Sequence, residues 1–406
     1  MTERPATPDT TRADAVGLRE AMVTELRHTG AIATDRVAAA LSAVPRHEFA
    51  LGETLEAAYV ADRALVTKQD EHGTAISSLS AAHIQAVMLE QAAVEPGMRV
   101  LEIGSGGYNA ALLAELVGPA GKVVSVDIDP EITARARACL DASGYAWVEV
   151  VTADAEHGVP EAAPYDRIIV TVGAWDVPPA WIDQLAKDGR LVVPLRLRGL
   201  TRSIAFDRVD TALLSDSYRL AGFVPMQGQG AFAERLVRLE DGVGLRIDDD
   251  SQRFDVGVLR EALRTPPIEV WTGAAYDLPD ELELYLMTRL RHPAMLHVGE
   301  EHIDSGRFNP AAGRGVAALI HAGSLAYRIK RDNPATASGY ESGVIAHGPA
   351  AQEAAEEYAE LLRRWADHHR RRGAATITYL PGGAGVLAPG QGVVIKKHGA
   401  LATSWD

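Results

Sequence analysis

Between residues 99 and 194 the chain alternates short runs of β-branched residues with segments of helical periodicity, the pattern of βαβ units. Such units build a mostly parallel sheet that helices cover on both faces. Helical repeats at 110–118 and 132–144 end at Gly118 and Gly144, as helices commonly do. Strands are expected at 99–103, 122–127, 147–152, 167–172 and 190–195, with further ones at 203–209 and 218–224. The sequence therefore predicts an α/β fold of the doubly wound, Rossmann-like kind.

With 406 residues the chain is long enough for more than one domain, and its composition changes along its length. Residues 1–13 are polar and contain proline, which predicts a disordered tail. Residues 14–237 form the expected catalytic domain, with a helical N-terminal region interrupted by a loop at 44–73. Periodicity is lost at 238–255, where Asp and Gly concentrate, which predicts a linker. Residues 256–406 mix helical and strand patterns and predict an α+β accessory domain for substrate recruitment.

Charge and cysteine content exclude several classes of protein. The 55 acidic residues exceed the 40 basic ones by 15, so the basic surface that binds a phosphate backbone is missing and we expect no nucleic-acid partner. Charged residues, glycine or proline interrupt every apolar run before about 18 residues, so we expect no membrane span. Cys139 is the single cysteine, which excludes a thiolate metal cluster; we expect no metal and a cytoplasmic location.

The first strand of the predicted sheet leads into a glycine-rich turn at 104–107 and then into a helix. Glycines let the backbone approach a ligand closely, and a helix N-terminus offers free N–H groups. A dinucleotide fingerprint requires glycine where Asn109 stands, which argues against a nicotinamide cofactor. Glu102, just before the turn, can accept hydrogen bonds from the ammonium group of a cofactor that contains an amino acid. This combination favours S-adenosyl-L-methionine, which becomes S-adenosyl-L-homocysteine on methyl transfer.

Two more acidic residues follow the next two strands. Asp127 can accept hydrogen bonds from two ribose hydroxyls, and Asp154 can recognise the amine of adenine. Each of them alone could equally cap a turn or a helix. Because the carboxyl ends of parallel strands meet at one edge of the sheet, their occurrence together with Glu102 favours a cofactor site. The predicted cofactor-binding residues are Glu102, Gly104, Ser105, Gly106, Gly107, Asn109, Asp127, Ile128, Asp154, Ala155 and Thr171.

Six segments between residues 18 and 226 form the pattern of a known family. They are VPRHEF at 44–49, AYVAD at 58–62, SAAHIQAVMLE at 80–90, LEIGSGGYNAALLAEL at 101–116, APYDRIIVT at 163–171 and DQLAKDGRLVVP at 183–194. In this order they resemble the protein-L-isoaspartate O-methyltransferases, a branch of the class I S-adenosylmethionine-dependent methyltransferases. The resemblance implies a class I methyltransferase fold and transfer of a methyl group to a carboxylate.

The resemblance also implies a catalytic hydroxyl at Ser80. The family usually has Ser-Gln-Pro where this chain has Ser-Ala-Ala at 80–82. A small shift in the alignment would bring Ser77 or Ser78 to the same place, and Ser80 could equally be the N-cap of the following helix. The predicted substrate-binding residues are Ser77, Ser78, Tyr59 and His83.

Two features differ from the compact repair enzymes of this family: the Ser-Ala-Ala segment and about 150 further residues after the catalytic domain. An extended architecture of this kind resembles the methyltransferases of lanthipeptide and graspetide biosynthesis. We therefore expect methylation of an aspartyl side chain in a macrocyclised precursor peptide, with the ester leading to succinimide or isoaspartate. One alternative is repair of isoaspartyl damage in proteins. Another is a scaffold that binds the cofactor without turnover, because the glycine turn is one residue shorter than usual. No oligomeric state is predicted.

Overall fold

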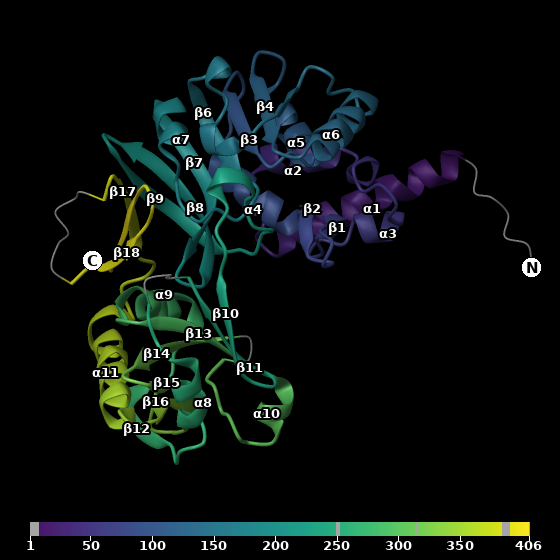
Figure 1. Cartoon of the computed structure of the whole chain (residues 1–406). Coiled ribbons are helices and arrows are strands. Elements are labelled where there is room, and N and C mark those ends of the chain that lie inside the picture. The colour runs from purple at the N-terminus through teal and green to yellow at the C-terminus, as the bar shows by residue number, and fades with distance from the viewer. Residues whose placement is uncertain (1–7, 249–251, 313–314, 384–389, 406) are drawn as a thin grey trace, which may run out of the picture. The chain divides into compact units, whose positions relative to one another are not determined.

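A computed structural model describes residues 8–248, 252–312, 315–383 and 390–405, and the chain forms two compact units (Figure 1). Unit 1 comprises the chain up to Leu195 together with Thr201–Phe232, and unit 2 comprises Arg196–Leu200 and Ala233–Asp406. The two units are described separately below.

Unit 1 contains the predicted sheet, with strand order β9-β8-β7-β6-β3-β4-β5 (Figure 1). Its strands are β3 (Arg99–Ile103), β4 (Lys122–Asp127), β5 (Glu149–Thr152), β6 (Tyr165–Val170), β7 (Leu185–Leu197), β8 (Leu200–Val209) and β9 (Ala212–Leu220). Strands β3 to β7 pair in parallel, and β8 pairs antiparallel with β9. The predicted α/β class is confirmed. Strand β3 lies between β4 and β6, so the chain changes direction across the sheet there, and such switch points are where these sheets bind ligands.

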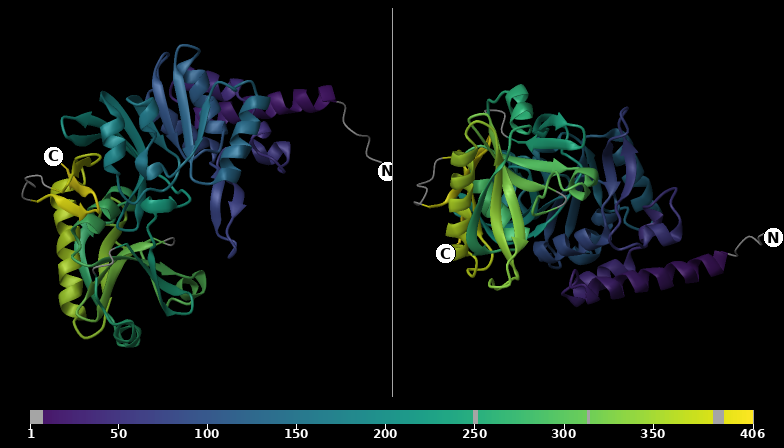
Figure 2. Two further views of the ribbon diagram at one scale, coloured as in Figure 1. Left: turned by 45° about the horizontal axis from the view of Figure 1, so that its top comes forward. Right: turned by 90° about the horizontal axis from the view of Figure 1, so that it is seen from below.

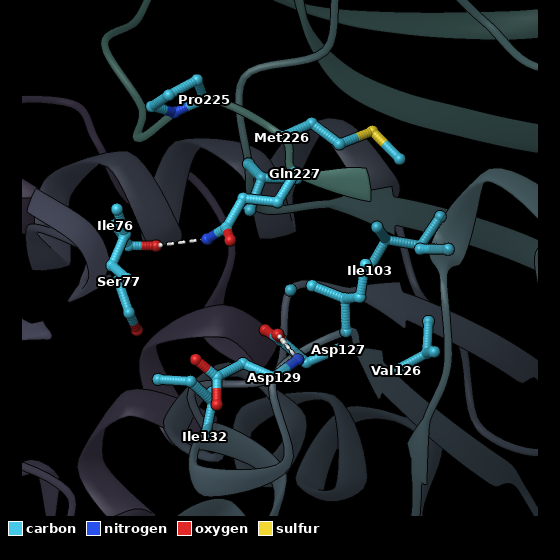
Figure 3. A pocket seen from close by; sticks show the side chains of 14 residues that line it. Ile76, Ser77, Ile103, Val126, Asp127, Asp129, Ile132, Pro225, Met226 and Gln227 are labelled. Carbon is cyan, nitrogen blue, oxygen red and sulfur yellow. Dashed lines mark hydrogen bonds between the residues drawn. The ribbon is translucent and has the colours of Figure 1, made fainter. Parts of the chain in front are cut away.

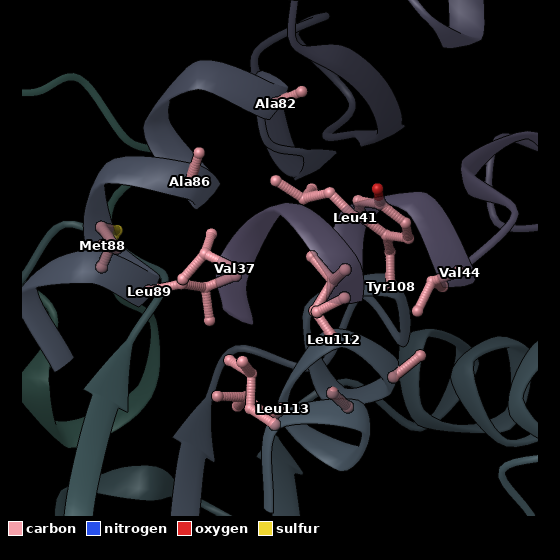
Figure 4. Packing of buried hydrophobic residues seen from close by; sticks show 14 of the residues in the cluster. Val37, Leu41, Val44, Ala82, Ala86, Met88, Leu89, Tyr108, Leu112 and Leu113 are labelled. Atoms are coloured by element: carbon pink, nitrogen blue, oxygen red, sulfur yellow. The ribbon is translucent and has the colours of Figure 1, made fainter. Parts of the chain in front are cut away.

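Helices of unit 1 pack closely against one another through buried apolar side chains (Figure 4). The helices of unit 1 are α1 (Pro8–His28), α2 (Asp35–Ala43), α3 (Leu55–Ala58), α4 (Ala82–Ala92), α5 (Tyr108–Val117), α6 (Pro130–Ala142) and α7 (Pro179–Gln184). Leu41 of α2, Leu89 of α4 and Leu112 of α5 are almost fully buried in one apolar cluster. Each such burial stabilises the fold by roughly 1.5–3 kcal/mol. The cluster therefore fixes the helices that begin at the site described below.

The expected disordered tail at 1–13 is corrected in part. Residues 1–7 lie outside the described residues, but α1 begins at Pro8. The buried side chains of Ala15, Met22 and Leu26 anchor this helix to unit 1. Once a helix is anchored, each added turn gains hydrogen bonds without a new nucleation step, so polar residues at its start can join it.

The expected loop at 44–73 contains part of a hairpin instead of irregular chain. Strands β1 (Leu65–Gln69) and β2 (Ala75–Leu79) pair antiparallel and project as a hairpin (Figure 2). Asp70 closes the turn, because its Oδ1 accepts the N–H groups of His72 (2.9 Å) and Thr74 (2.8 Å). The sequence predicted no strand here, and this hairpin carries two of the predicted serines.

Unit 2 has the predicted α+β character. Its seven-stranded sheet has the order β10-β11-β13-β14-β15-β16-β12. The elements are β10 (Arg235–Glu240), β11 (Val243–Ile247), α8 (Val256–Ala262), β12 (Ile268–Ala275), α9 (Pro279–Arg289), β13 (Pro293–Val298), α10 (Glu300–Asp304), β14 (Val316–His321), β15 (Ser324–Asp332), β16 (Tyr340–His347), α11 (Ala351–Arg364), β17 (Thr376–Pro381), β18 (Gly392–Ile395) and β19 (Gly399–Ser404). Strands β17, β18 and β19 pair antiparallel with one another, in the order β18-β19-β17.

The predicted linker at 238–255 is also corrected, because β10 and β11 form a hairpin across its first part. Gly242 makes the turn with a φ of +70°, a conformation that glycine adopts without strain. Short strands separated by a glycine turn have no helical periodicity, which explains why the segment resembled a linker. Across the described ranges, no helix is both long and apolar enough to cross a membrane.

Candidate active site

Two adjoining cavities of unit 1 lie at the carboxyl ends of β3 and β4, and Figure 3 shows the first of them. Ile103, Ile128 and Met226 are among the apolar residues that line the first, which we call the apolar cavity. Glu102 lines the second, which we call the polar cavity, and Asp127 borders both. The cavities are therefore at the switch point of the sheet, where ligands are expected.

Two glycines shape the turn between β3 and α5. Gly104 has a φ of +98°, and a Cβ there would lie 2.6 Å from Oγ1 of Thr171. Gly107 has a φ of +83°, and a Cβ there would lie 3.2 Å from the ring of Phe49. The Thr171 hydroxyl lies 3.0 Å from the carbonyl oxygen of Ile103 and 2.9 Å from that of Gly104, to which it donates. Only residues without a side chain allow the turn to pack this closely against its neighbours.

Glu102 is fully buried at the end of β3. Its Oε2 accepts a hydrogen bond from the Ser125 hydroxyl, whereas Oε1 has no hydrogen-bond partner among the described residues. Burial raises the pKa of this carboxyl to about 7, and the Ser125 hydrogen bond and the nearby Asn109 amide offset only part of the rise. An unpartnered oxygen in a buried site is unfavourable, and a cationic group in the polar cavity would satisfy it. Glu102 therefore fits the ammonium group that the sequence predicts there.

Asp127 is half-buried at the end of β4 and is held by backbone hydrogen bonds. Its Oδ2 accepts the N–H of Ser105 and its Oδ1 accepts the N–H of Asp129, each at 3.0 Å. Burial raises its pKa, and the two N–H groups counteract the rise. Each carboxylate oxygen can accept a further hydrogen bond. The carboxylate is thus fixed at the cavity edge with acceptor capacity for two hydroxyls.

Asp154 follows β5, as predicted, and caps a turn there. Its Oδ1 accepts the N–H of Glu156 at 3.0 Å, which makes it the N-cap of a short 3-10 helix, and its Oδ2 accepts the N–H of Gln229 at 2.9 Å. Asp154 lines neither cavity, whereas Ala155 lines the apolar one. The capping role left open for Asp154 is confirmed, and its contact with adenine stays a prediction.

The three predicted serines lie together at the polar cavity. The Ser77 hydroxyl is 2.8 Å from that of Thr67 in β1, so it already has a partner. Ser78 and Ser80 also line a larger groove between β2, the start of α4 and residues 220–225, which we call the β2 groove. These two hydroxyls therefore lie where the polar cavity and the β2 groove meet.

Ser80 is not the cap of the following helix. Helix α4 begins at Ala82, and its N-cap residue is Ala81, which makes no side-chain capping bond. The capping alternative for Ser80 is therefore wrong, and its hydroxyl is available to the cavity.

Arg46, in the VPRHEF segment at 44–49, is fully buried and connects Ser80 to the glycine turn. Its guanidinium donates to the carbonyl oxygen of Ala58 (2.8 Å), to Oε1 of Gln85 (2.7 Å) and to the carbonyl oxygen of Ser80 (2.7 Å). Its Cζ lies 5.0 Å from the ring centre of Tyr108, the first residue of α5. One side chain thus fixes Ser80 relative to the turn that precedes α5.

The other two predicted substrate contacts differ from each other. Tyr59 is only 5% exposed, and its hydroxyl lies 2.8 Å from Nδ1 of His47. It lines neither cavity nor the β2 groove, so its prediction as a substrate contact is corrected to a structural pairing with His47. His83 does line the β2 groove, with Nδ1 at 3.2 Å from the carbonyl oxygen of Ala61. When Nδ1 carries the proton, Nε2 remains as an acceptor.

Most of the predicted cofactor and serine residues line the two cavities: Ser77, Ser78, Ser80, Glu102, Gly104, Gly106, Asn109, Asp127, Ile128, Ala155 and Thr171. Ser105 and Gly107 lie in the same turn without lining either one. The sequence missed Ile76, Asp129 and Gln227, which line the apolar cavity. The side-chain amide of Gln227 donates to the carbonyl oxygen of Ile76 at 3.4 Å (Figure 3). In the part of the chain that the structure describes, no three acidic, histidine or cysteine side chains are grouped to bind a metal.

Comparisons with known proteins agree with this geometry. Residues 18–231 match the family profile of "Protein-L-isoaspartate(D-aspartate) O-methyltransferase (PCMT)". The protein-L-isoaspartate O-methyltransferase of Methanopyrus kandleri is 38% identical over 219 residues, which are 53% of this chain and 94% of the relative. That of Thermotoga maritima is 39% identical over 174 residues, which are 43% of this chain and 54% of the relative.

A solved structure named protein-L-isoaspartate O-methyltransferase is 25% identical and superimposes with a TM-score of 0.50, covering 89% of this chain and 96% of that one. Residues 1–232 are little more than half of this chain, so the shared structure includes much of unit 2. The family profile alone covers more than half of the chain. The chain therefore belongs to the protein-L-isoaspartate O-methyltransferase family.

Proposed function

We propose that the protein methylates the free α-carboxylate of isoaspartyl residues in polypeptides, with S-adenosyl-L-methionine as the methyl donor. The observation that carries the proposal is the position of Ser78 and Ser80. They border both the polar cavity, which Glu102 and Asp127 line, and the β2 groove. A cofactor site and an acceptor site therefore meet at two hydroxyl groups.

The residues of the two cavities fit the parts of this cofactor. S-adenosyl-L-methionine supplies a methyl group that a positively charged sulfur activates for transfer. In the proposal, the free oxygen of Glu102 accepts a hydrogen bond from the ammonium group, and Asp127 accepts from the ribose hydroxyls. Ile128 and Met226 offer apolar contacts for the adenine ring.

The acceptor needs positioning more than activation. An isoaspartyl carboxylate is ionised at neutral pH and is itself the nucleophile, so no general base is required. Ser80 donates one hydrogen bond to a carboxylate oxygen and orients the group. Ser80 leaves the other oxygen free to take the methyl group that the bound cofactor would supply. The next backbone nitrogen can then displace methanol from the ester, and the resulting succinimide hydrolyses to aspartate or isoaspartate.

The peptide-tailoring interpretation has less support than repair. The family's proline corresponds to Ala82, which is fully buried at the first position of α4. Proline is favoured at that position for backbone reasons, so the departure affects the start of a helix and does not alter a group in the β2 groove. The C-terminal extension is shared in large part with a solved protein named protein-L-isoaspartate O-methyltransferase, so it does not favour tailoring either.

A pair of peptides that differ only in one residue, isoaspartyl or aspartyl, tests the proposal. We expect methylation of the isoaspartyl peptide to be at least roughly 100-fold faster, because the proposal places the α-carboxylate of isoaspartate, and not the side-chain carboxylate of aspartate, beside Ser80. Mass spectrometry would detect the gain of a methyl group and the later loss of methanol. Methylation of an aspartyl residue in a macrocyclised peptide, without methylation of the isoaspartyl peptide, would instead establish the tailoring function.

Replacing Ser80 by alanine is expected to lower kcat/KM for the isoaspartyl peptide by roughly tenfold to 100-fold, the effect of one hydrogen bond to a charged group. Cofactor affinity should stay close to that of the wild type. Ser77→Ala is the matched comparison, because the Ser77 hydroxyl already pairs with Thr67. A larger loss in Ser78→Ala than in Ser80→Ala would transfer the catalytic role to Ser78.

Cofactor affinity is expected to fall by about tenfold for each pH unit below 7. Because burial raises the pKa of Glu102 to about 7, this carboxyl is protonated in more acidic solution and must lose its proton to pair with an ammonium group. Calorimetric titration in buffers of different ionisation enthalpy would measure the proton release. Glu102→Gln should bind the cofactor more weakly at neutral pH and show neither the pH dependence nor the proton release.

The same pKa has the opposite consequence for the fold without cofactor. Between about pH 4.5 and pH 7 the folded protein keeps a proton on Glu102 that the unfolded chain releases. The contribution of Glu102 to stability therefore decreases as the pH rises through this interval. The unfolding temperature of the wild type, measured relative to that of Glu102→Gln, should therefore decrease as the pH rises through this interval. A difference that stays constant with pH would contradict the raised pKa.

A further inference from the structure

We infer that Lys68 is a positioning residue that holds the β1–β2 hairpin closed over the apolar cavity, and that the cofactor leaves when this contact breaks. The inference rests on the proposed cofactor position, because it takes the occupant of the cavity to be the adenosyl part of the cofactor. It does not depend on whether the methyl acceptor is isoaspartyl or aspartyl. It adds an opening step and a residue outside both cavities that controls this step.

The hairpin forms part of the wall around the proposed cofactor. Ile76 and Ser77 of β2 line both cavities, and Figure 3 shows them among the side chains around the apolar one. The segment from the end of β4 to the start of α6 lines the same cavity through Asp127, Asp129 and Ile132. A cofactor in the two cavities would therefore contact β2, so the position of the hairpin affects how readily the cofactor leaves.

The hairpin is anchored in the core only at its base. Leu65 of β1 and Leu79 of β2 are paired opposite each other and are 2% and 3% exposed. Residues 66–78, all of which the structure describes, include no buried residue. A segment with little buried apolar surface opens at a low cost in free energy. The hairpin can therefore move about Leu65 and Leu79 without disturbing the core.

Beyond the base, polar side chains hold the hairpin, and Lys68 makes the ion pairs. Its Nζ lies 2.6 Å from Oδ2 of Asp129 and 2.7 Å from Oε2 of Glu131. The hydrogen bonds to the carbonyl oxygens of Thr67 and Ile76 are longer, at 3.2 and 3.4 Å. The Lys68 side chain is 29% exposed, so water and salt weaken its ion pairs. Such contacts can hold the hairpin in place and still break easily.

Asp129 connects Lys68 to the proposed ribose contact. Its Oδ1 accepts the N–H of Glu131 at 2.9 Å, which makes it the N-cap of α6. Its own N–H donates to Oδ1 of Asp127 at 3.0 Å, and its Oδ2 accepts from Lys68. The ion pair thus joins the hairpin to the segment that carries Asp127, so breaking it separates two walls of the apolar cavity.

Stopped-flow measurements of S-adenosyl-L-homocysteine binding to the full-length protein test the inference. For Lys68→Met we expect the dissociation rate constant to rise by about threefold to tenfold, the effect of losing partly exposed ion pairs. The difference from the wild type should become smaller at high salt, because salt screens the ion pairs that only the wild type has. Lys68→Arg keeps the charge and should restore most of the wild-type rate.

Lys122→Met is the matched control. Lys122 also forms a partly exposed ion pair, with Glu149 at 2.8 Å, and it lines neither cavity. Its loss should leave the dissociation rate constant at the wild-type value, because this pair lies outside the hairpin.

Two spin labels, one on the hairpin turn and one on α6, report the position of the hairpin without any turnover. The labels are attached through Glu71→Cys and Ala142→Cys, at two exposed positions, in a Cys139→Ser background that removes the one native cysteine. Without cofactor, we expect Lys68→Met to broaden the distribution of distances between the labels. Addition of S-adenosyl-L-homocysteine should narrow the distribution both with and without Lys68.

The inference is overturned if Lys68→Met releases S-adenosyl-L-homocysteine at the wild-type rate, if Lys122→Met has the same effect, or if the label distances do not depend on Lys68. Because these measurements use no acceptor peptide, such results leave the proposed methylation of isoaspartyl residues intact. Methylation of aspartyl peptides alone would instead end the proposed function and leave the role of Lys68 to be decided by the same binding kinetics and label distances.

Discussion

Replacing Asp127 by alanine is expected to raise the dissociation constant of S-adenosyl-L-methionine by at least about 100-fold, because hydrogen bonds to a charged group contribute about 1.5–3 kcal/mol each. In the proposed cofactor position the carboxylate accepts one hydrogen bond from each of two ribose hydroxyls, so the variant would lack two such bonds. The substitution also removes the acceptor of the Ser105 and Asp129 N–H groups, which hold the glycine turn and the start of α6 at the cavity. Calorimetric titration of the folded variant would measure the decrease in affinity.

Two further variants separate these contributions. Asp127→Asn keeps an oxygen acceptor but loses the charge, so its affinity should fall between those of the wild type and Asp127→Ala. Asp141→Ala removes an exposed aspartate of α6 that pairs with Arg137 and lies outside both cavities, and it should bind the cofactor normally. Wild-type affinity in a correctly folded Asp127→Ala variant would refute this role for Asp127 and the cofactor position built on it.

The central sheet could be predicted from the sequence because its strands are buried on both faces. The strands at 99–103 and 122–127 have the predicted bounds, since each is a short, β-branched-rich segment, buried after its first residue, that ends at a glycine turn or an acid. The family, the methyltransferase fold and the use of S-adenosyl-L-methionine are also confirmed, and they could be predicted for a second reason. They depend on motifs that are local in the chain, where the order of residues alone carries the signal.

The β1–β2 hairpin could not be predicted in this way. A two-stranded hairpin is marginal by itself, and this one is supported by distant residues. Lys68 forms an ion pair with Asp129 at 2.6 Å, and Arg135 donates to the carbonyl oxygen of Thr67 at 3.2 Å. Both partners belong to the region around α6, more than 60 residues along the chain. Local sequence patterns do not predict such contacts between distant residues.

The residues of the candidate site also differ in whether a local motif marks them. Glu102 and Asp127 could be predicted because each ends a strand at the switch point. Gln227 and the other residues after β9 reach the apolar cavity only through the fold, and no motif marks them. Function is harder still to predict, because a C-terminal extension by itself does not distinguish repair from peptide tailoring. A solved protein-L-isoaspartate O-methyltransferase that covers 89% of this chain shares much of this extension.

The second large effect is expected for Arg46→Met, which should lower kcat by at least about 100-fold. It should also reduce the free energy of unfolding, since each buried acceptor left unpaired costs about 1–3 kcal/mol. The three acceptors are the carbonyl oxygens of Ala58 and Ser80 and the side chain of Gln85. Without the guanidinium, Ser80 is no longer fixed relative to the glycine turn. Arg46 touches neither cavity, so we expect it to act as a positioning residue through Ser80.

The kinetic parameters separate positioning from general loss of structure. At a temperature where Arg46→Met remains folded, we expect kcat to fall while cofactor affinity changes by less than about threefold, because Glu102 and Asp127 are untouched. Arg46→Lys keeps the charge but cannot reproduce the planar set of donors, so it should recover only part of the rate. Arg36→Met is the control: Arg36 is exposed and donates one hydrogen bond, to the carbonyl oxygen of Val94 at 2.7 Å. Normal kcat in folded Arg46→Met would mean that the methyl acceptor is oriented without the Arg46–Ser80 connection.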